Sequence, residues 1–260
     1  GIMGLGHALI KLGVRYDNAD GRKKVEQIFN FMKKRAYESS TYLAAEKGSF
    51  PAFDADKFLE SGFCQTLTKG IRAKIKEYGI RNCAILTIAP TGTTSIMAAT
   101  SSGIEPVFSP GYKRRYYASK EGSNDRVIEE EIVIDPLFQE LYEDGYDLGA
   151  FVSAHEIDVE DHLRMQSIVQ KHIDNAVSKT INLPHDYPVE KYGQLLQKYG
   201  PKLKGTTVYR SGSRGNEPLV PLSVEEAISH LQNKDVLIGA AQSDCPSGIC
   251  EISEPKIEIE

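Results

Sequence analysis

The chain has 260 residues, of which 40% are hydrophobic and 26% are charged, and its formal net charge is −5. This length suits one large domain or two small ones, and the composition is typical of a globular protein. The acidic balance argues against a nucleic-acid coat or a polybasic membrane binder, and no apolar run approaches the roughly 20 residues of a membrane-spanning helix. Since no signal-peptide pattern is present either, we expect a cytoplasmic protein with no nucleic-acid or membrane partner.

The chain starts in the middle of a helical pattern. Gly1 rather than methionine is the first residue, and Ile2, Leu5, Leu9 and Leu12 already share one helical face. We therefore expect a piece of a longer polypeptide, or a half that is made separately.

The remaining elements follow from the spacing of apolar residues and from the residues that cap helices. In chain order, the sequence predicts helices over 26–46 and 66–78, a strand over 83–88, a helix that begins at 96–99, a strand over 103–108, extended or hairpin segments over 113–119 and 127–134 around a turn at 122–125, a helix over 158–176, a strand over 179–183, a helix over 188–199, a strand over 205–210 and a helix over 223–231. Strands that alternate with helices predict an α/β domain with parallel strands, which we place at residues 1–234. Residues 235–260 are predicted to form a flexible tail.

The stretch 89–96 is the most informative motif, because a short apolar run precedes it and a helix start follows it. In such a turn, free backbone N–H groups, hydroxyls and the positive end of the helix dipole converge on one point, which suits a phosphate. The residues predicted to bind phosphate are Pro90, Thr91, Gly92, Thr93, Thr94 and Ser95. The alternative is a well-capped helix start without a ligand. The turn matches no Walker motif, and a dinucleotide fingerprint at the N-terminus fails because Leu9 replaces its third glycine; those first glycines are expected to allow close helix packing.

Two cysteines, Cys245 and Cys250, lie five residues apart in the predicted tail. A mobile dithiol of this kind can close into a disulfide and reopen, which suits electron transfer to a buried site. A zinc half-site and two incidental surface thiols are the alternatives. The other two cysteines, Cys64 and Cys83, have apolar neighbours and are expected in the core.

Other charged and imidazole groups receive structural interpretations. The basic run 113–115 is expected to be a solvated strand face rather than a nucleic-acid contact, because the chain is acidic. Four of the six histidines, His155, His162, His172 and His185, show no metal-binding spacing, so we expect structural or surface roles and no metal site.

Six stretches, taken in their order along the chain, resemble one known family. They are 1–6 (GIMGLG), 90–95 (PTGTTS), 102–108 (SGIEPVF), 161–166 (DHLRMQ), 174–184 (DNAVSKTINLP) and 204–214 (KGTTVYRSGSR). Together they are similar to the large catalytic subunit of ribonucleotide reductase, and most similar to its adenosylcobalamin-dependent class. One such motif alone would be weak evidence for a family. Six motifs in the family's order make the resemblance specific, and they cover most of residues 1–214.

The resemblance implies a fold, a substrate and partners. The fold would be the C-terminal part of an α/β barrel built from two halves of parallel strands. Residues 90–95 would hold the phosphates of a ribonucleoside di- or triphosphate that is converted to a deoxyribonucleotide. Cys245 and Cys250 would re-reduce an active-site disulfide and would themselves be reduced by thioredoxin or glutaredoxin.

The class assignment depends on two observations that point in different directions. The dithiol tail is most similar to that of the class that uses a diiron partner subunit. That class, however, relays its radical through two adjacent tyrosines, and the matching positions here read Val208 and Tyr209. We therefore expect adenosylcobalamin as the cofactor, and keep a fragment of a diiron-dependent reductase as an alternative.

The family's radical cysteine, its neighbouring glutamate and its barrel pair of reducing cysteines lie upstream of the segment that resembles residues 1–13. We therefore expect this chain to be inactive without its N-terminal half. A catalytically silent nucleotide-binding module is the alternative from another functional class, and a homodimer is left open.

Overall fold

The structure is a computed structural model that describes residues 1–119, 126–213, 219–233 and 236–238. Its helices are α1 (Leu5–Lys11), α2 (Ala19–Lys47), α3 (Ala55–Glu60), α4 (Gly62–Gln65), α5 (Lys69–Tyr78), α6 (Gly92–Met97), α7 (Pro136–Glu143), α8 (Val159–Gln170), α9 (Val189–Tyr199) and α10 (Val224–Asn233). Its strands are β1 (Gly111–Ser119), β2 (Arg126–Ile134), β3 (Thr180–Leu183), β4 (Thr207–Arg210), β5 (Leu219–Pro221) and β6 (Leu237–Ile238). None of the helices in these ranges has both the length and the apolar character needed to cross a membrane.

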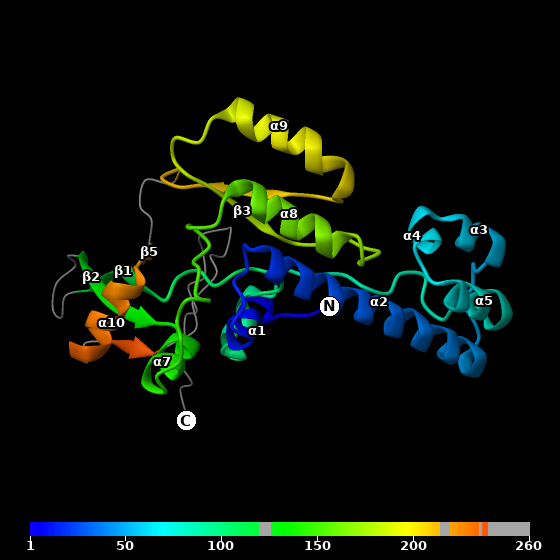
Figure 1. Cartoon of the computed structure of the whole chain (residues 1–260), viewed down its shortest axis with the longest axis horizontal. Helices are drawn as coiled ribbons and strands as arrows, with labels where there is room; N and C mark the ends of the chain where they lie inside the picture. Colours follow the sequence, from blue (N-terminus) through cyan, green and yellow to red (C-terminus); the bar gives the residue numbers. More distant parts are fainter. Residues whose placement is uncertain (120–125, 214–218, 234–235, 239–260) are drawn as a thin grey trace, which may run out of the picture.

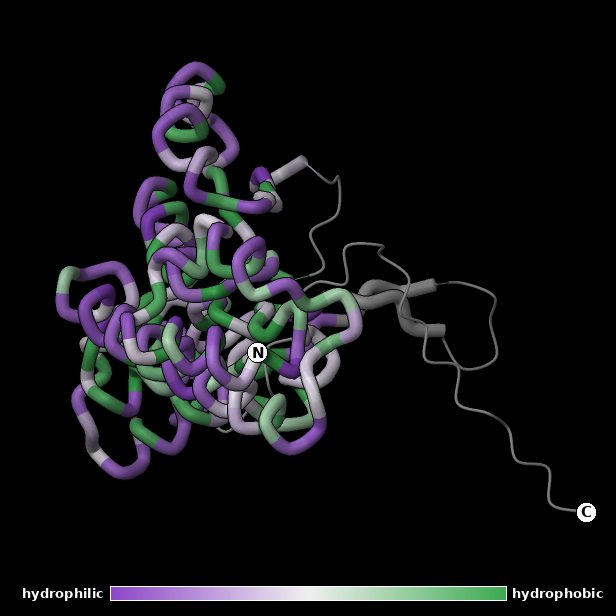
Figure 2. Tube along the Cα trace, turned by 90° about the vertical axis from the view of Figure 1, so that its right-hand side faces the viewer, coloured by the Kyte–Doolittle hydropathy of each residue, from purple (hydrophilic) through white to green (hydrophobic). Residues whose placement is uncertain are grey.

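Helix α2 is the longest element and links the main core to a small outer cluster (Figure 1). It starts earlier than the predicted residue 26, because the Asn18 side chain caps it by accepting a hydrogen bond from Gly21 N. Its predicted end at Gly48 is confirmed, where a φ of 78° favours glycine. Its N-terminal half contributes Val25 and Phe29 to the main core, which also contains α1 and α8 residues. Figure 2 shows that hydrophilic residues, drawn in purple, lie mostly at the outside of the folded chain.

The outer cluster consists of α3, α4 and α5 packed on the far half of α2. Each of these short helices begins after a side-chain cap, and the caps are Asp54, Ser61 and Thr68. Cys64 is buried here as predicted, whereas Cys83 is exposed, so its predicted place in the core is wrong.

The predicted strand over 83–88 does not form as a strand. The backbone N–H groups of Ile85 and Leu86 instead donate to the two carboxylate oxygens of Asp174, at 2.7 and 2.6 Å. A single parallel bridge joins Ile88 to Val177. One carboxylate thus takes the place of a neighbouring strand for two backbone donors.

The predicted strand over 103–108 is also absent. Gly103 has a φ of 45°, and Glu105 N donates to Ser102 O at 2.7 Å, which closes a turn. Pro106 then has no N–H to donate to a ladder. The segment is therefore a loop, and it forms one wall of the site described below.

The predicted hairpin is confirmed as β1 and β2, which pair antiparallel from Gly111 opposite Ile134 to Ser119 opposite Arg126. Its predicted turn at 122–125 lies outside the described residues. Strand β5 pairs antiparallel with β1, and β6 pairs parallel with β2, so the sheet order is β5-β1-β2-β6. The short strand β6 lies within the segment predicted as a tail.

The predicted strands over 179–183 and 205–210 form β3 and β4, which pair in parallel from Thr180 opposite Thr207 to Leu183 opposite Arg210. Helices α8 and α9 pack near them around a shared apolar cluster (Figure 1). Helix α8 begins after Asp158 as predicted but ends at Gln170 rather than at residue 176. There the Gln170 side-chain amide donates to two backbone carbonyls of the following loop, which stabilises the non-helical path.

Helix α7 was not predicted, although its local signals are strong. Asp135 Oδ1 accepts hydrogen bonds from Leu137 N and Phe138 N, and Pro136 occupies the first turn. The predicted capping box at the start of α10 is confirmed, because Ser223 and Glu226 exchange side-chain to backbone hydrogen bonds.

Candidate functional site

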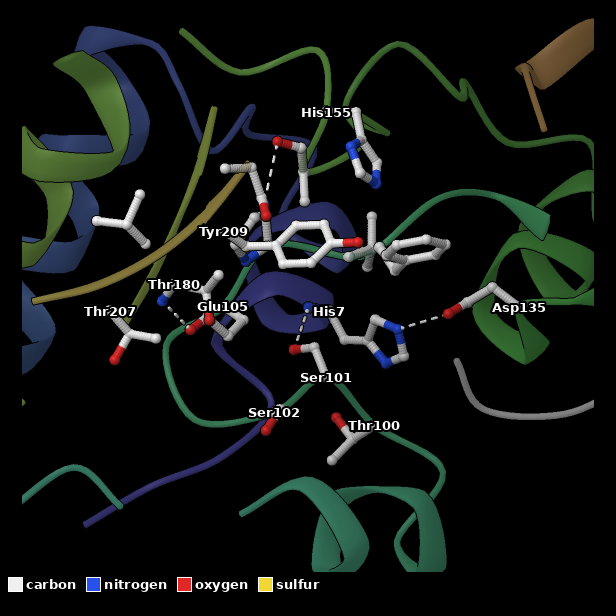
Figure 3. Close-up of a pocket in the computed structure, with 16 residues that line it drawn as sticks. His7, Thr100, Ser101, Ser102, Glu105, Asp135, His155, Thr180, Thr207 and Tyr209 are labelled. Atoms are coloured by element: carbon white, nitrogen blue, oxygen red, sulfur yellow. Dashed lines mark hydrogen bonds and ion pairs between the residues drawn. The ribbon is translucent and has the colours of Figure 1, made fainter. Parts of the chain in front are cut away.

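A cavity of about 240 Å³ lies between α1, the loop over 100–108 and the parallel pair β3–β4 (Figure 3). Its lining residues are His7, Thr100, Ser101, Ser102, Glu105, Pro106, Val107, Phe108, Asp135, Ala154, His155, Thr180, Asn182, Thr207, Val208 and Tyr209. Hydroxyl, carboxyl and imidazole groups therefore share this pocket with apolar surface, as ligand pockets usually require.

Helix α1 approaches the loop closely at Gly6. A Cβ atom at this position would lie 2.7 Å from Glu105 O and 3.1 Å from Ser101 Oγ, so a larger residue would push the loop away. Gly4 N donates to Ser101 O at 2.7 Å, and His7 N donates to Ser101 Oγ at 3.3 Å. The expected close packing of the N-terminal glycines is confirmed here, and its partner is the pocket loop.

The predicted phosphate turn forms the start of α6. The first hydrogen bond within the helix runs from Ser95 N to Thr91 O, at 2.8 Å. The N–H groups of residues 92–94 therefore have no acceptor within the helix. Thr93 and Thr94 are exposed, whereas Ser95 is buried and its hydroxyl donates to Gly92 O at 2.8 Å. The turn thus presents backbone donors and two hydroxyls at its surface, while the Ser95 hydroxyl already has a partner.

This turn adjoins the pocket but does not line it. Thr91 Oγ1 accepts a hydrogen bond from Gly103 N at 2.9 Å and lies 3.3 Å from Ser102 Oγ. The Ser102 hydroxyl also donates to Pro90 O. Because Ser102 lines the pocket, these bonds fix the turn against one pocket wall.

Glu105 enters the pocket from the opposite part of the same loop. Its Oε2 accepts from Lys179 Nζ at 2.6 Å, and its Oε1 accepts from Thr180 N at 2.7 Å. The second bond anchors the first residue of β3, which also lines the pocket. Glu105 thus joins the loop to the parallel strand pair.

Lys179 and His162 form a buried extension of this contact. Lys179 Nζ donates to Glu105 Oε2, to Thr180 O at 2.6 Å and to His162 Nδ1 at 2.9 Å. His162 Nε2 lies 3.0 Å from Ala154 O, so the imidazole is neutral with its proton on Nε2. Burial and the neighbouring Lys179 charge lower the pKa of His162 to about 2, in agreement with that neutral form.

The charge on Lys179 is set by two opposing effects. Burial lowers the pKa of Lys179, and the Glu105 carboxylate opposes this shift. Three acceptors surround Nζ, which matches the three donors of an ammonium group. The motifs of the sequence contain Lys179, His162 and Glu105, but no role was predicted for Lys179 or Glu105, and His162 was expected to have a structural or surface role. The sequence signal that could have identified this site is Lys179 itself, a charged residue directly before the apolar strand β3.

A second polar pair closes the other side of the pocket. His7 Nε2 lies 3.1 Å from Asp135 Oδ2, and both side chains are buried. Because a carboxylate oxygen only accepts, His7 donates from Nε2 to Asp135 Oδ2. Figure 3 shows His7 between Asp135 and the hydroxyl residues of the loop. This pair was not predicted from the sequence.

Aromatic side chains cover the pocket. Tyr209, the single tyrosine noted in the sequence of β4, extends across it (Figure 3), and its neighbour Val208 is 41% exposed. Phe108 and His155 make an edge-to-face contact with ring centroids 5.0 Å apart. These rings supply apolar and stacking surface beside the polar wall.

The remaining predicted groups lie away from the pocket or outside the structure. Within the described part of the chain, no three His, Cys, Asp or Glu side chains gather as they would around a metal ion. Cys245 and Cys250 lie outside the described residues, so their redox role stays a prediction. His172 is buried beside Glu26, and His185 lies 3.1 Å from Ser211 O, so neither takes part in the site.

Residues 1–209 match the family model described as ribonucleotide reductase, barrel domain. A vitamin B12-dependent ribonucleoside-diphosphate reductase of Mycobacterium tuberculosis (strain CDC 1551 / Oshkosh) is 34% identical, and the match covers 84% of this chain and 32% of that protein. The protein of the same name from Thermoplasma acidophilum is 30% identical over 96% of this chain and 34% of its own length.

A more distant relative carries a different name. The ribonucleoside-diphosphate reductase 1 subunit alpha of Escherichia coli (strain K12) is 26% identical over 97% of this chain and 32% of that protein. The chain spans about a third of the length of these curated relatives.

Proposed function

The chain belongs to the ribonucleotide reductase family, and from this membership we propose that it is part of an enzyme that converts ribonucleotides to deoxyribonucleotides by radical chemistry. The predicted family is confirmed by the match over residues 1–209 and by relatives at 30–34% identity. That match is the observation on which the proposal rests. The reaction itself belongs to a protein about three times as long, so the substrate and the partners are parts of the proposal.

The substrate phosphates are proposed to bind at residues 90–95. The support is geometric: the N–H groups that precede the α6 ladder and the exposed hydroxyls of Thr93 and Thr94 lie beside a pocket. Thr91 and Ser102 connect that turn to the pocket wall. The sugar and base of the ligand would then extend into the cavity.

Adenosylcobalamin is the proposed cofactor of the complete enzyme, because the relatives at 30–34% identity are named vitamin B12-dependent. The pocket does not fit this group by itself. Its volume of about 240 Å³ lies below the range of roughly 300–1,000 Å³ that drug-sized ligands occupy, and a corrin ring is larger than such ligands. No step of the reaction is therefore assigned to the cofactor through these residues.

A diiron-dependent reductase is the second candidate. The predicted dithiol at Cys245 and Cys250 favours it, because this tail is most similar to that of the diiron class. Against it, Tyr209 has Val208 rather than a second tyrosine beside it. A radical relay through two adjacent tyrosines would therefore lack one of the two tyrosines in β4.

The finer parts of the proposal come from the resemblance. The reactive thiol would come from another part of the reductase, since Cys64 and Cys83 do not line the pocket. Thioredoxin or glutaredoxin would reduce the dithiol, and the enzyme would act in the cytoplasm. The domain division at residue 234 belongs to the same set of proposals.

Reconstitution tests the proposal. The chain is combined with the N-terminal half of the reductase, adenosylcobalamin, a ribonucleoside diphosphate and a small dithiol, and deoxyribonucleotide is measured. The expected result is product that depends on adenosylcobalamin. Product that depends instead on a small radical subunit would establish the diiron class. Ribonucleotide binding without turnover in every combination would favour a silent nucleotide-binding module.

A further inference from the structure

Glu105 combines two properties that seldom occur together: it is part of a buried ion pair, and it faces the pocket. Its side chain is 22% exposed, whereas that of Lys179 is 0% exposed. Its two oxygens each accept one hydrogen bond from the protein, from Lys179 Nζ and from Thr180 N. The carboxylate is therefore fixed in position while part of it stays open to a ligand (Figure 3).

An ionised carboxylate has about four acceptor positions and no donor. Two of the positions on Glu105 have protein partners, so the carboxylate can still accept from a ligand. It attracts hydroxyl and amino donors, and it repels phosphate because both groups are anionic. The pocket wall at Glu105 is accordingly selective for the uncharged, donor-bearing part of a ligand.

Lys179 holds this carboxylate in a fixed orientation. All three of its donors have acceptors within the protein: Glu105 Oε2, Thr180 O and His162 Nδ1. With no exposed surface, Lys179 does not reach a ligand and cannot bind phosphate itself. Its influence on a ligand passes through Glu105, which makes it a positioning residue.

We propose that Glu105 accepts a hydrogen bond from a ribose hydroxyl of the bound ribonucleotide and that Lys179 positions Glu105 for this contact. The ribose would then lie at the Glu105 wall while the phosphates lie at the turn over 90–95, where N–H groups and hydroxyls favour an anion. This inference rests on the proposed function, because it assumes a ribonucleotide ligand.

The test measures equilibrium binding of a ribonucleoside diphosphate and of its 2′-deoxy and 3′-deoxy analogues to the complete reductase. In the wild type, the analogue that lacks the contacted hydroxyl binds about 10-fold more weakly, as expected for one hydrogen bond to a charged acceptor. Glu105→Gln weakens binding of the ribonucleotide by a similar factor but leaves that analogue almost unchanged. The hydroxyl preference therefore disappears in the variant.

Further variants separate the positioning role from a structural one. Lys179→Met removes the cation paired with Glu105 and leaves only the Thr180 N–H bond to orient the carboxylate, so it is expected to reduce the hydroxyl preference. The double variant Glu105→Gln, Lys179→Met has no buried charge left at the pair, so it remains informative where the single lysine variant fails to fold. The matched control is Lys171→Met, which removes a Lys–Glu contact of the same 2.6 Å length at the exposed pair with Glu26. This control retains the full hydroxyl preference.

The outcomes are distinct. A hydroxyl preference that persists in Glu105→Gln and in the double variant overturns the assignment of Glu105, while the proposed function stands. Equal weakening of all three ligands by Glu105→Gln also overturns it, because that pattern indicates a general structural defect. If the wild type binds no ribonucleotide at all, the proposed function fails and this inference fails with it.

Discussion

His7 Nε2 lies 3.1 Å from Asp135 Oδ2, which joins α1 to the start of α7 across 128 residues of sequence. The same carboxylate caps α7 through its other oxygen, which accepts from Leu137 N and Phe138 N. One side chain therefore holds a helix start and a pocket residue together. Both side chains are buried, so the loss of either partner leaves a polar group without compensation.

Replacement of Asp135 should separate these two roles. Asp135→Ala removes the cap and the His7 contact, and we expect a loss of about 2–4 kcal/mol in the free energy of unfolding. Asp135→Asn retains a capping oxygen and should cost less than Asp135→Ala. Urea denaturation of the two variants measures the difference. Equal losses would mean that the cap contributes little.

Substitutions in the phosphate turn should affect substrate binding more than turnover. Thr93→Val and Thr94→Val remove exposed hydroxyls near the N–H groups of α6, and each is expected to raise KM by about 5- to 10-fold with a small change in kcat. The control is Thr87→Val, which makes the same chemical change outside the turn. An unchanged KM in both turn variants would contradict phosphate binding at these hydroxyls.

The predicted redox role of the dithiol can be tested with two reductants. Cys245→Ser should slow turnover with thioredoxin and spare turnover with a small dithiol, because a small reductant can reach the active-site disulfide directly. Steady-state rates with each reductant measure this split, and Cys83→Ser is the control at an exposed cysteine outside the predicted pair. Equal losses with both reductants would exclude a shuttle.

The close approach at Gly6 predicts a sensitivity to added volume. Gly6→Ala places a Cβ 2.7 Å from Glu105 O, and we expect a loss of about 1–3 kcal/mol in the free energy of unfolding. The matched control is Gly193→Ala in α9, where the added Cβ has no neighbour within 4 Å and should stabilise the helix by up to about 1 kcal/mol. Thermal and urea unfolding of both variants give the comparison.

His162 predicts how stability changes with pH. Its folded-state pKa of about 2 lies below its ordinary value of 6.5, so folding favours the neutral ring. The stability that it contributes is complete above about pH 6.5 and is lost as the pH falls from there, by up to about 1.4 kcal/mol per pH unit. His162→Phe should reduce that slope between pH 6.5 and 4, and an unchanged slope would contradict this contribution of His162. Urea unfolding across this pH range is the measurement.

The sequence by itself predicted the elements whose signals are local. The start of α8 after Asp158 and the capping box of Ser223 and Glu226 depend on bonds between residues two or three positions apart. The ordered motifs also identified the family over residues 1–209. Helix α7 could have been predicted on the same grounds, since its cap and first-turn proline are adjacent in the sequence.

Only the tertiary structure decided what happens at longer range. The run over 83–88 has strand character, yet the Asp174 carboxylate, about ninety residues away, takes two of its backbone donors. The pocket likewise depends on Lys179 meeting Glu105 across 74 residues and on His7 meeting Asp135 across 128. Capping hydrogen bonds join residues a few positions apart, so they can be predicted from the sequence. The contacts of the pocket form only when the folded chain brings distant segments together. The sequence therefore determined the family and the turn over 90–95, and the fold decided which charged groups face the pocket beside that turn.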